Sequence, residues 1–197
     1  MSDPEEVLDY WLGDVGPEGW YAGGVLLDTE IRDRFADLWS AATRGGLDHW
    51  IDGAGPALAY IVLTDQFPRN MWRGQAAAFE TDTLARAAAA RAIEAGWDLQ
   101  APEPDRQFFY LPFEHSEHLP DQDRSVALFA ERMPETGAEN LLHARAHRDI
   151  IARFGRFPFR NAALGRPSTP DEETFLATGG YGAVVERLKG AGGDGAA

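Results

Sequence analysis

Apolar residues recur three and four positions apart along nearly the whole chain, and this helical periodicity is the strongest constraint on its fold. Between Asp28 and Arg44, for example, Ile31, Phe35 and Leu38 share one helical face, and two glycines then end the segment. No stretch alternates as a half-buried strand does. The pattern predicts an all-α protein of about eight or nine helices, further ones beginning near Pro56, Asp82, Asp121, Ala138 and Thr169.

Helices of this length, joined by short turns, pack in antiparallel pairs as bundles or α-solenoids. The 197 residues suit one domain, which we expect to span residues 1–188. The remaining stretch, "KGAGGDGAA" at 189–197, has no apolar periodicity and is expected to be a flexible tail.

Composition restricts both the chemistry and the location of the protein. Without cysteine there are no disulfides, thiolate metal sites or cysteine nucleophiles. The acidic start, "MSDPEEVLDYW", is unlike a signal peptide, and no apolar run is long enough to span a membrane, so we expect a cytoplasmic location. The net charge of −14 disfavours nucleic acid and anionic membranes as partners.

One segment opposes this acidic balance. Between Asn140 and Pro170 six arginines stand against one acid, Asp149, which gives a local charge of +5. A cationic segment on an acidic protein favours a small anionic molecule or an acidic peptide as a partner. The alternative is that these arginines form ion pairs with acids elsewhere in the chain.

Two stretches, "DQFPRNMWR" at 65–73 and "RFGRFPFRNAA" at 153–163, combine arginine, asparagine, proline and aromatic residues. In the first we expect Pro68 to end a helix. In the second we expect Gly155, in the left-handed conformation, to end a helix that covers about Ala138 to Phe154, and Pro158 to prevent its resumption. Each rigid corner would then present an Arg–Asn pair. An acid at a helix C-terminus opposes the helix dipole, so we expect Asp65 to have a compensating partner, which could be Arg69, Arg73 or an arginine of the 153–160 loop. The predicted ligand-binding residues are Gln66, Arg69, Asn70, Arg73, Arg153, Arg156, Arg160 and Asn161.

The stretch "FEHSEHLPDQD" at 113–123 is the most polar part of the chain. On a helix Glu114 and His118 would share one face, and such a group could bind a metal or form an oriented general base. The zinc signature HExxH is absent, and we assign no metal. The alternatives are that "HSE" closes a helix end, or that His115 and Glu117 line a ligand pocket.

The stretch "ENLLHARAHRDIIARF" at 139–154 places Glu139, His143 and His147 at i, i+4 and i+8 on one helical face. Because Ile150 and Ile151 continue that side, a structural role for the histidines is favoured over metal binding. The chain has no GxSxG elbow, phosphate-binding loop or dinucleotide fingerprint, and no cofactor is expected.

Three long motifs, "LTDQFPRNMWRG", "FFYLPFEHSEHLPDQDRSVALF" and "HRDIIARFGRFPFRNAALGR", resemble the bacterial DUF924 family. The resemblance extends from "VLDYWLG" at residue 7 to "EETFLA" ending at residue 177. It implies a TPR-like all-helical fold with a concave surface and implies no reaction.

Three functions are compatible with these observations. The arginines and aromatic residues could bind an anionic ligand. Alternatively an enzyme could use His115, Glu117, Asp65 and His147 for acid–base chemistry. In the third interpretation, arginines and acids form ion pairs that only hold the helices together.

Overall fold

The computed structural model describes residues 3–193, and no β-strand occurs among them, which confirms the all-α prediction. The chain divides into two compact units. Unit 1 ends at Pro112 and unit 2 begins at Phe113. Each unit has its own core and is described separately.

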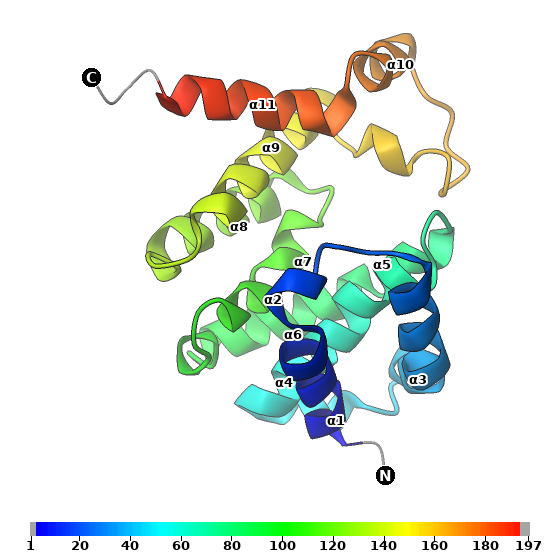
Figure 1. The fold of residues 1–197 in the computed structure, drawn as a ribbon, viewed down its shortest axis with the longest axis vertical. Helices are drawn as coiled ribbons and strands as arrows, with labels where there is room; N and C mark the ends of the chain where they lie inside the picture. Colours follow the sequence, from blue (N-terminus) through cyan, green and yellow to red (C-terminus); the bar gives the residue numbers. More distant parts are fainter. Residues whose placement is uncertain (1–2, 194–197) are drawn as a thin grey trace. The chain divides into compact units, whose positions relative to one another are not determined.

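Unit 1 is built from longer helical stretches with short 3₁₀-helices and turns between them (Figure 1). Within it α4 packs against α1 and α6, and α3 packs against α5. Its α-helices are α1 (Pro4–Leu8), α2 (Gly16–Gly19), α3 (Val25–Thr43), α4 (Ala54–Ile61), α5 (Phe67–Met71) and α6 (Asp82–Glu94). Its π- and 3₁₀-helices are η1 (Asp9–Val15), η2 (Asp48–Asp52), η3 (Val62–Gln66), η4 (Ala76–Phe79), η5 (Asp98–Gln100) and η6 (Asp105–Phe109).

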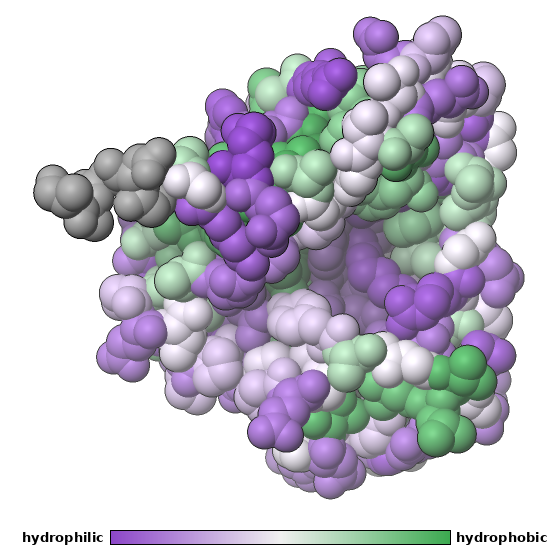
Figure 2. Space-filling view, turned by 45° about the horizontal axis from the view of Figure 1, so that its top comes forward, coloured by the Kyte–Doolittle hydropathy of each residue, from purple (hydrophilic) through white to green (hydrophobic). Residues whose placement is uncertain are grey.

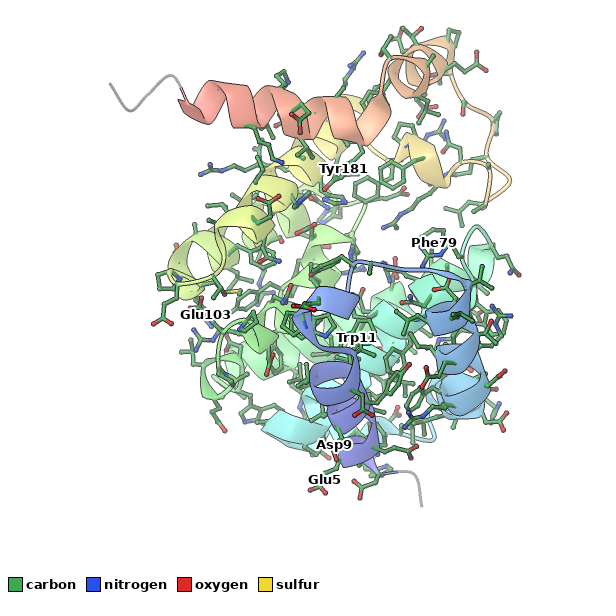
Figure 3. The ribbon with its side chains drawn as sticks, viewed as in Figure 1. Glu5, Asp9, Trp11, Phe79, Glu103 and Tyr181 are labelled. Carbon is green, nitrogen blue, oxygen red and sulfur yellow. The ribbon has the colours of Figure 1, made fainter. Side chains whose placement is uncertain are left out.

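The core of unit 1 is aromatic. Trp11, labelled in Figure 3, is fully buried and meets Phe67 and Phe108 edge-on. Phe35 lies 4.7 Å from Phe67, ring centre to ring centre. Such ring contacts join η1, α3, α5 and η6, which explains how short helices hold a common core.

The helix containing Pro68 does not end where the sequence predicted. Instead η3, a π-helical turn, connects α4 directly to α5, and the N–H of Phe67 donates to the carbonyl of Val62. Pro68 cannot donate to the Thr64 carbonyl, so that oxygen accepts the Thr81 hydroxyl at 2.6 Å instead. The wider turn accommodates the proline, and the first of the two predicted corners is a bulge within a helix.

Unit 2 contains α8 (Leu119–Arg132), α9 (Ala138–Phe154), η7 (Pro158–Arg160), α10 (Pro170–Ala177) and α11 (Gly180–Gly193). In Figure 1 α9 lies beside both α8 and α11, and both pairs are in contact. Ile150, Ile151, Phe157 and Phe175 form a buried core there. Thr169 starts α10 with a capping box.

Two other local predictions have different outcomes. Gly155 ends α9 with φ of 68°, in the left-handed conformation, as predicted. The prediction that Glu114 and His118 share a helical face is wrong, because α7 (Leu111–Glu114) ends at Glu114 and α8 begins only at Leu119. Of the predicted 189–197 tail, residues up to Gly193 belong to α11, and residues 194–197 lie outside the described residues.

On the face shown in Figure 2, hydrophilic residues predominate and hydrophobic residues gather in separate patches. The most exposed large apolar side chains of the described residues are Leu26 and Val25, at the start of α3. Between residues 3 and 193, no helix is both long and apolar enough to cross a membrane.

Candidate functional site

A buried glutamate–histidine pair is the most distinctive polar contact of unit 2. Glu114, at the end of α7, is 3% exposed, and its Oε1 lies 2.9 Å from Nδ1 of His147 on α9. The same Nδ1 lies 3.0 Å from the carbonyl oxygen of His143. Because both neighbours are acceptors, Nδ1 must carry the hydrogen. In the neutral ring Nε2 is then the basic atom.

Neither Nε2 of His147 nor Oε2 of Glu114 has a hydrogen-bond partner among the described residues. A buried carboxylate that accepts an imidazole N–H holds the ring in one tautomer and one orientation. The pair therefore has the arrangement of a histidine base with a carboxylate that orients it.

A second histidine, His143, lies one turn earlier on α9 and makes its own contacts. Its Nδ1 is hydrogen-bonded to the hydroxyl of Tyr181, which comes from the start of α11 and is labelled in Figure 3. Its Nε2 lies 3.3 Å from Glu139. Burial, with smaller contributions from Glu114 and Glu139, raises the pKa of Tyr181 well above its usual value. The tyrosine therefore stays protonated, and its hydroxyl donates a hydrogen bond to Nδ1 of His143.

Aromatic rings surround His147. Its ring centre lies 4.9 Å from Tyr181, 5.3 Å from Phe157 and 6.4 Å from His115. Phe159 stacks on Phe157 and is 42% exposed, so the group reaches the surface of unit 2. Flat apolar rings beside a basic nitrogen can hold an organic molecule against that nitrogen.

The loop that carries Phe157 and Phe159 is held by Glu117. Its carboxylate accepts the Phe157 N–H at 2.8 Å and two hydrogen bonds from Arg166, at 2.7 and 2.9 Å. Burial opposes ionisation of Glu117, but the bonds from Arg166 and Phe157 outweigh it and lower its pKa. Glu117, predicted as an acid–base candidate, thus positions the loop that carries Phe157 and Phe159.

The other polar residues of this loop are also engaged. Arg156 donates to both oxygens of buried Glu172, at 2.6 and 2.7 Å, and Asn161 donates to Glu172 at 3.3 Å. The Arg156 bonds, opposed by burial, lower the pKa of Glu172 to about 2. The guanidinium of Arg160 lies over Phe157, and that of Arg153 lies over Phe154.

The predicted binding residues of unit 1 form a similar network. Arg73 donates two hydrogen bonds to Asp28, at 2.8 and 2.9 Å, and Asn70 donates to the same carboxylate at 2.9 Å. Arg69 lies 2.9 Å from Asp82 and 3.3 Å from buried Asp65.

The partner expected for Asp65 is therefore confirmed as Arg69, which lies four residues further along the helix. Gln66 also donates to Asp65, at 2.5 Å. Each of these predicted binding residues thus contacts an acid of its own unit.

The sequence candidates consequently fall into two groups. Asp65, Gln66, Arg69, Asn70 and Arg73 belong to unit 1, and the predicted residues from His115 onward belong to unit 2.

Sequence reasoning did not find two members of the histidine group. Tyr181 stands 38 residues from its partner His143, and no spacing pattern links them. Glu114 was noticed as a possible metal ligand but not as the partner of His147.

The part of the chain described by the structure contains no cluster of three or more histidine or acidic side chains suited to a metal ion. The group considered around Glu114, His115 and His118 is interrupted by the helix end. The side chain of His118 is largely exposed, 3.8 Å from Asp121.

The fold and these contacts define an all-helical protein with an oriented histidine in an aromatic setting. The chain belongs to the DUF924 family, described as bacterial protein of unknown function, whose model matches residues 7–180. It is also similar to a solved structure, a protein of unknown function from Agrobacterium tumefaciens. The two are 43% identical over 89% of this chain and 97% of that chain, with a TM-score of 0.83. The comparison with curated proteins finds no match.

Proposed function

We propose that unit 2 contains the acid–base site of an enzyme that acts on a small organic molecule. Nε2 of His147 would be the atom that transfers the proton. The observation that carries this proposal is the 2.9 Å contact between Nδ1 of His147 and buried Glu114. It holds the ring in the tautomer whose Nε2 is directed away from the carboxylate and can accept a proton.

The aromatic group supplies the binding part of the proposal. Tyr181, Phe157 and Phe159 would contact the apolar part of the substrate, while His147 takes a proton from the substrate or from water. Tyr181 stays protonated, which suits a hydrogen-bond donor. Glu117 and Arg166 would act indirectly, by holding the loop that carries the two phenylalanines.

An anion-binding function is less well supported. Most of the arginines proposed for it already donate to carboxylates, as Arg69, Arg73 and Arg156 do. For each of these arginines, an anion would have to compete with a carboxylate of the same unit. The geometry therefore favours ion pairs that stabilise each unit over an arginine site for a ligand.

The test compares His147→Gln with His49→Gln, which changes an exposed histidine of unit 1. Each protein is incubated with a bacterial metabolite extract, and changes are followed by mass spectrometry. We expect the parent protein and His49→Gln to convert at least one metabolite, and His147→Gln to do so about 10²–10⁴-fold more slowly.

If none of the three proteins changed the metabolite profile relative to extract without protein, the enzyme proposal would be refuted. If His147→Gln converted the same metabolite at the parent rate, the protein could still be an enzyme, but His147 would have no part in proton transfer. Circular dichroism at the assay temperature would verify that the variants are folded.

A further inference from the structure

Unit 1 contains a pocket that is separate from the residues discussed so far. Its volume is about 270 Å³, just below the range of roughly 300–1,000 Å³ for small-molecule sites. Glu103, labelled in Figure 3, belongs to the segment that contributes Pro102 and Asp105 to its wall. Its lining residues include Leu12, Leu58, Trp97, Gln100, Asp105 and Phe109.

Asp105 is the one ionisable side chain in this wall. It is half-buried and makes no hydrogen bond or ion pair with the other described residues. The neighbouring Arg106 donates instead to the carbonyl of Ala101, at 3.0 Å, and lies 3.7 Å from Glu103. Burial raises the pKa of Asp105, as expected for a carboxylate with no cation nearby.

Apart from Gln100, the other side chains of the wall are apolar. Leu58 and Phe109 are buried, and Trp97 is half-buried. A neutral apolar guest would leave the carboxylate poorly hydrated and unpaired, and an anion would be repelled by it. A cation with an apolar body satisfies both parts of the wall, and the net charge of −14 favours its approach.

We propose that this pocket binds a small primary amine whose ammonium group pairs with Asp105 and whose aromatic or branched apolar part contacts Trp97, Leu58 and Phe109. The proposal is independent of the acid–base site of unit 2. It rests on the pocket, on its single unpaired carboxylate and on the mostly apolar character of the remaining wall.

The probe is 2-phenylethylamine, which carries an ammonium group two carbons from a phenyl ring. Its controls are 2-phenylethanol, which lacks the charge, and 3-phenylpropionate, which reverses it. Binding is measured by calorimetry and by tryptophan fluorescence. We expect the amine to bind at least about tenfold more tightly than either control, because a hydrogen bond to a charged group is lost without it.

Asp105→Asn keeps the shape of the side chain and removes its charge. It should weaken amine binding by about tenfold or more and abolish the preference for the amine over the alcohol. The matched control is Asp37→Asn, which removes one exposed acid of α3 and lowers the net charge equally. We expect it to leave amine affinity unchanged.

Two results would overturn the proposal. One is equal affinity for all three probes, including no binding of any. The other is unchanged amine affinity in Asp105→Asn. Since removal of an unpaired, half-buried charge should not destabilise unit 1, a melting temperature at or above that of the parent would verify that the variant is folded.

Discussion

Replacement of Arg166 by methionine tests how the aromatic loop of unit 2 is held. Arg166 donates two hydrogen bonds to Glu117, one to Oδ1 of Asn161 at 3.0 Å and one to the carbonyl of Phe157 at 3.2 Å. Methionine resembles the unbranched aliphatic part of arginine but donates none of these hydrogen bonds. The change leaves Glu117 with the Phe157 N–H at 2.8 Å.

The expected loss of stability follows from these contacts. Breaking a fully buried pair costs about 3–5 kcal/mol. The side chains of Arg166 and Glu117 are 24% and 27% exposed, so water screens part of the interaction. We expect Arg166→Met to lower the free energy of unfolding by about 2 kcal/mol at neutral pH, within the range for hydrogen bonds to charged groups.

The sign of the pH dependence can also be predicted. The pKa of Glu117 is lowered in the folded state from its ordinary value of 4.5. Its contribution to stability is therefore present above that value and is lost as the pH falls below it. The difference between the parent and Arg166→Met should shrink between neutral pH and about pH 3.

The assay is urea unfolding followed by far-ultraviolet circular dichroism. All six tryptophans precede Pro112, so tryptophan fluorescence reports on unit 1 and cannot follow unit 2 directly. Arg145→Met, which changes an exposed arginine of α9, is the matched control and should stay within about 0.5 kcal/mol of the parent. A loss below about 0.5 kcal/mol for Arg166→Met, or an equal loss at both pH values, would refute the reasoning.

Two further predictions concern a side chain that bonds a backbone carbonyl and a glycine in the left-handed conformation. Thr81→Val should lower the stability of unit 1 by about 2 kcal/mol, because the Thr64 carbonyl and the indole N–H of Trp39 each lose a buried partner. Tryptophan fluorescence in urea would measure this, and the exposed Thr29→Val should change little. Gly155→Ala should cost unit 2 about 1 kcal/mol, since φ is 68° although a Cβ would meet no atom within 4 Å. An unchanged circular-dichroism midpoint would contradict that expectation.

The sequence predicted the helices best where the signals were local. The expected helix from Ala138 to Phe154 has the observed bounds, because Gly155 adopts the left-handed conformation that ends it. Thr169 and Pro170 likewise mark the start of α10. Apolar spacing also placed His143 and His147 on successive turns of one helix.

Local reasoning failed where a distant group compensates a local cost. Pro68 was expected to end its helix, but the Thr81 hydroxyl donates a hydrogen bond to the Thr64 carbonyl, to which the proline cannot donate. A helix through residues 114–118 was one of the predicted alternatives, yet Gln122 donates at 2.6 Å to the carbonyls of Glu114 and Ser116, which stabilises an irregular turn.

By itself the sequence determined that the protein is helical, acidic and free of cysteine, and it identified the family. These properties depend on residue types and short spacings. The tertiary structure decided which acid meets which base: Arg73 pairs with Asp28, 45 residues away, and Arg166 with Glu117, 49 residues away. It also brought the carboxylate of Glu114 to Nδ1 of His147, 33 positions further along the chain, which leaves Nε2 available.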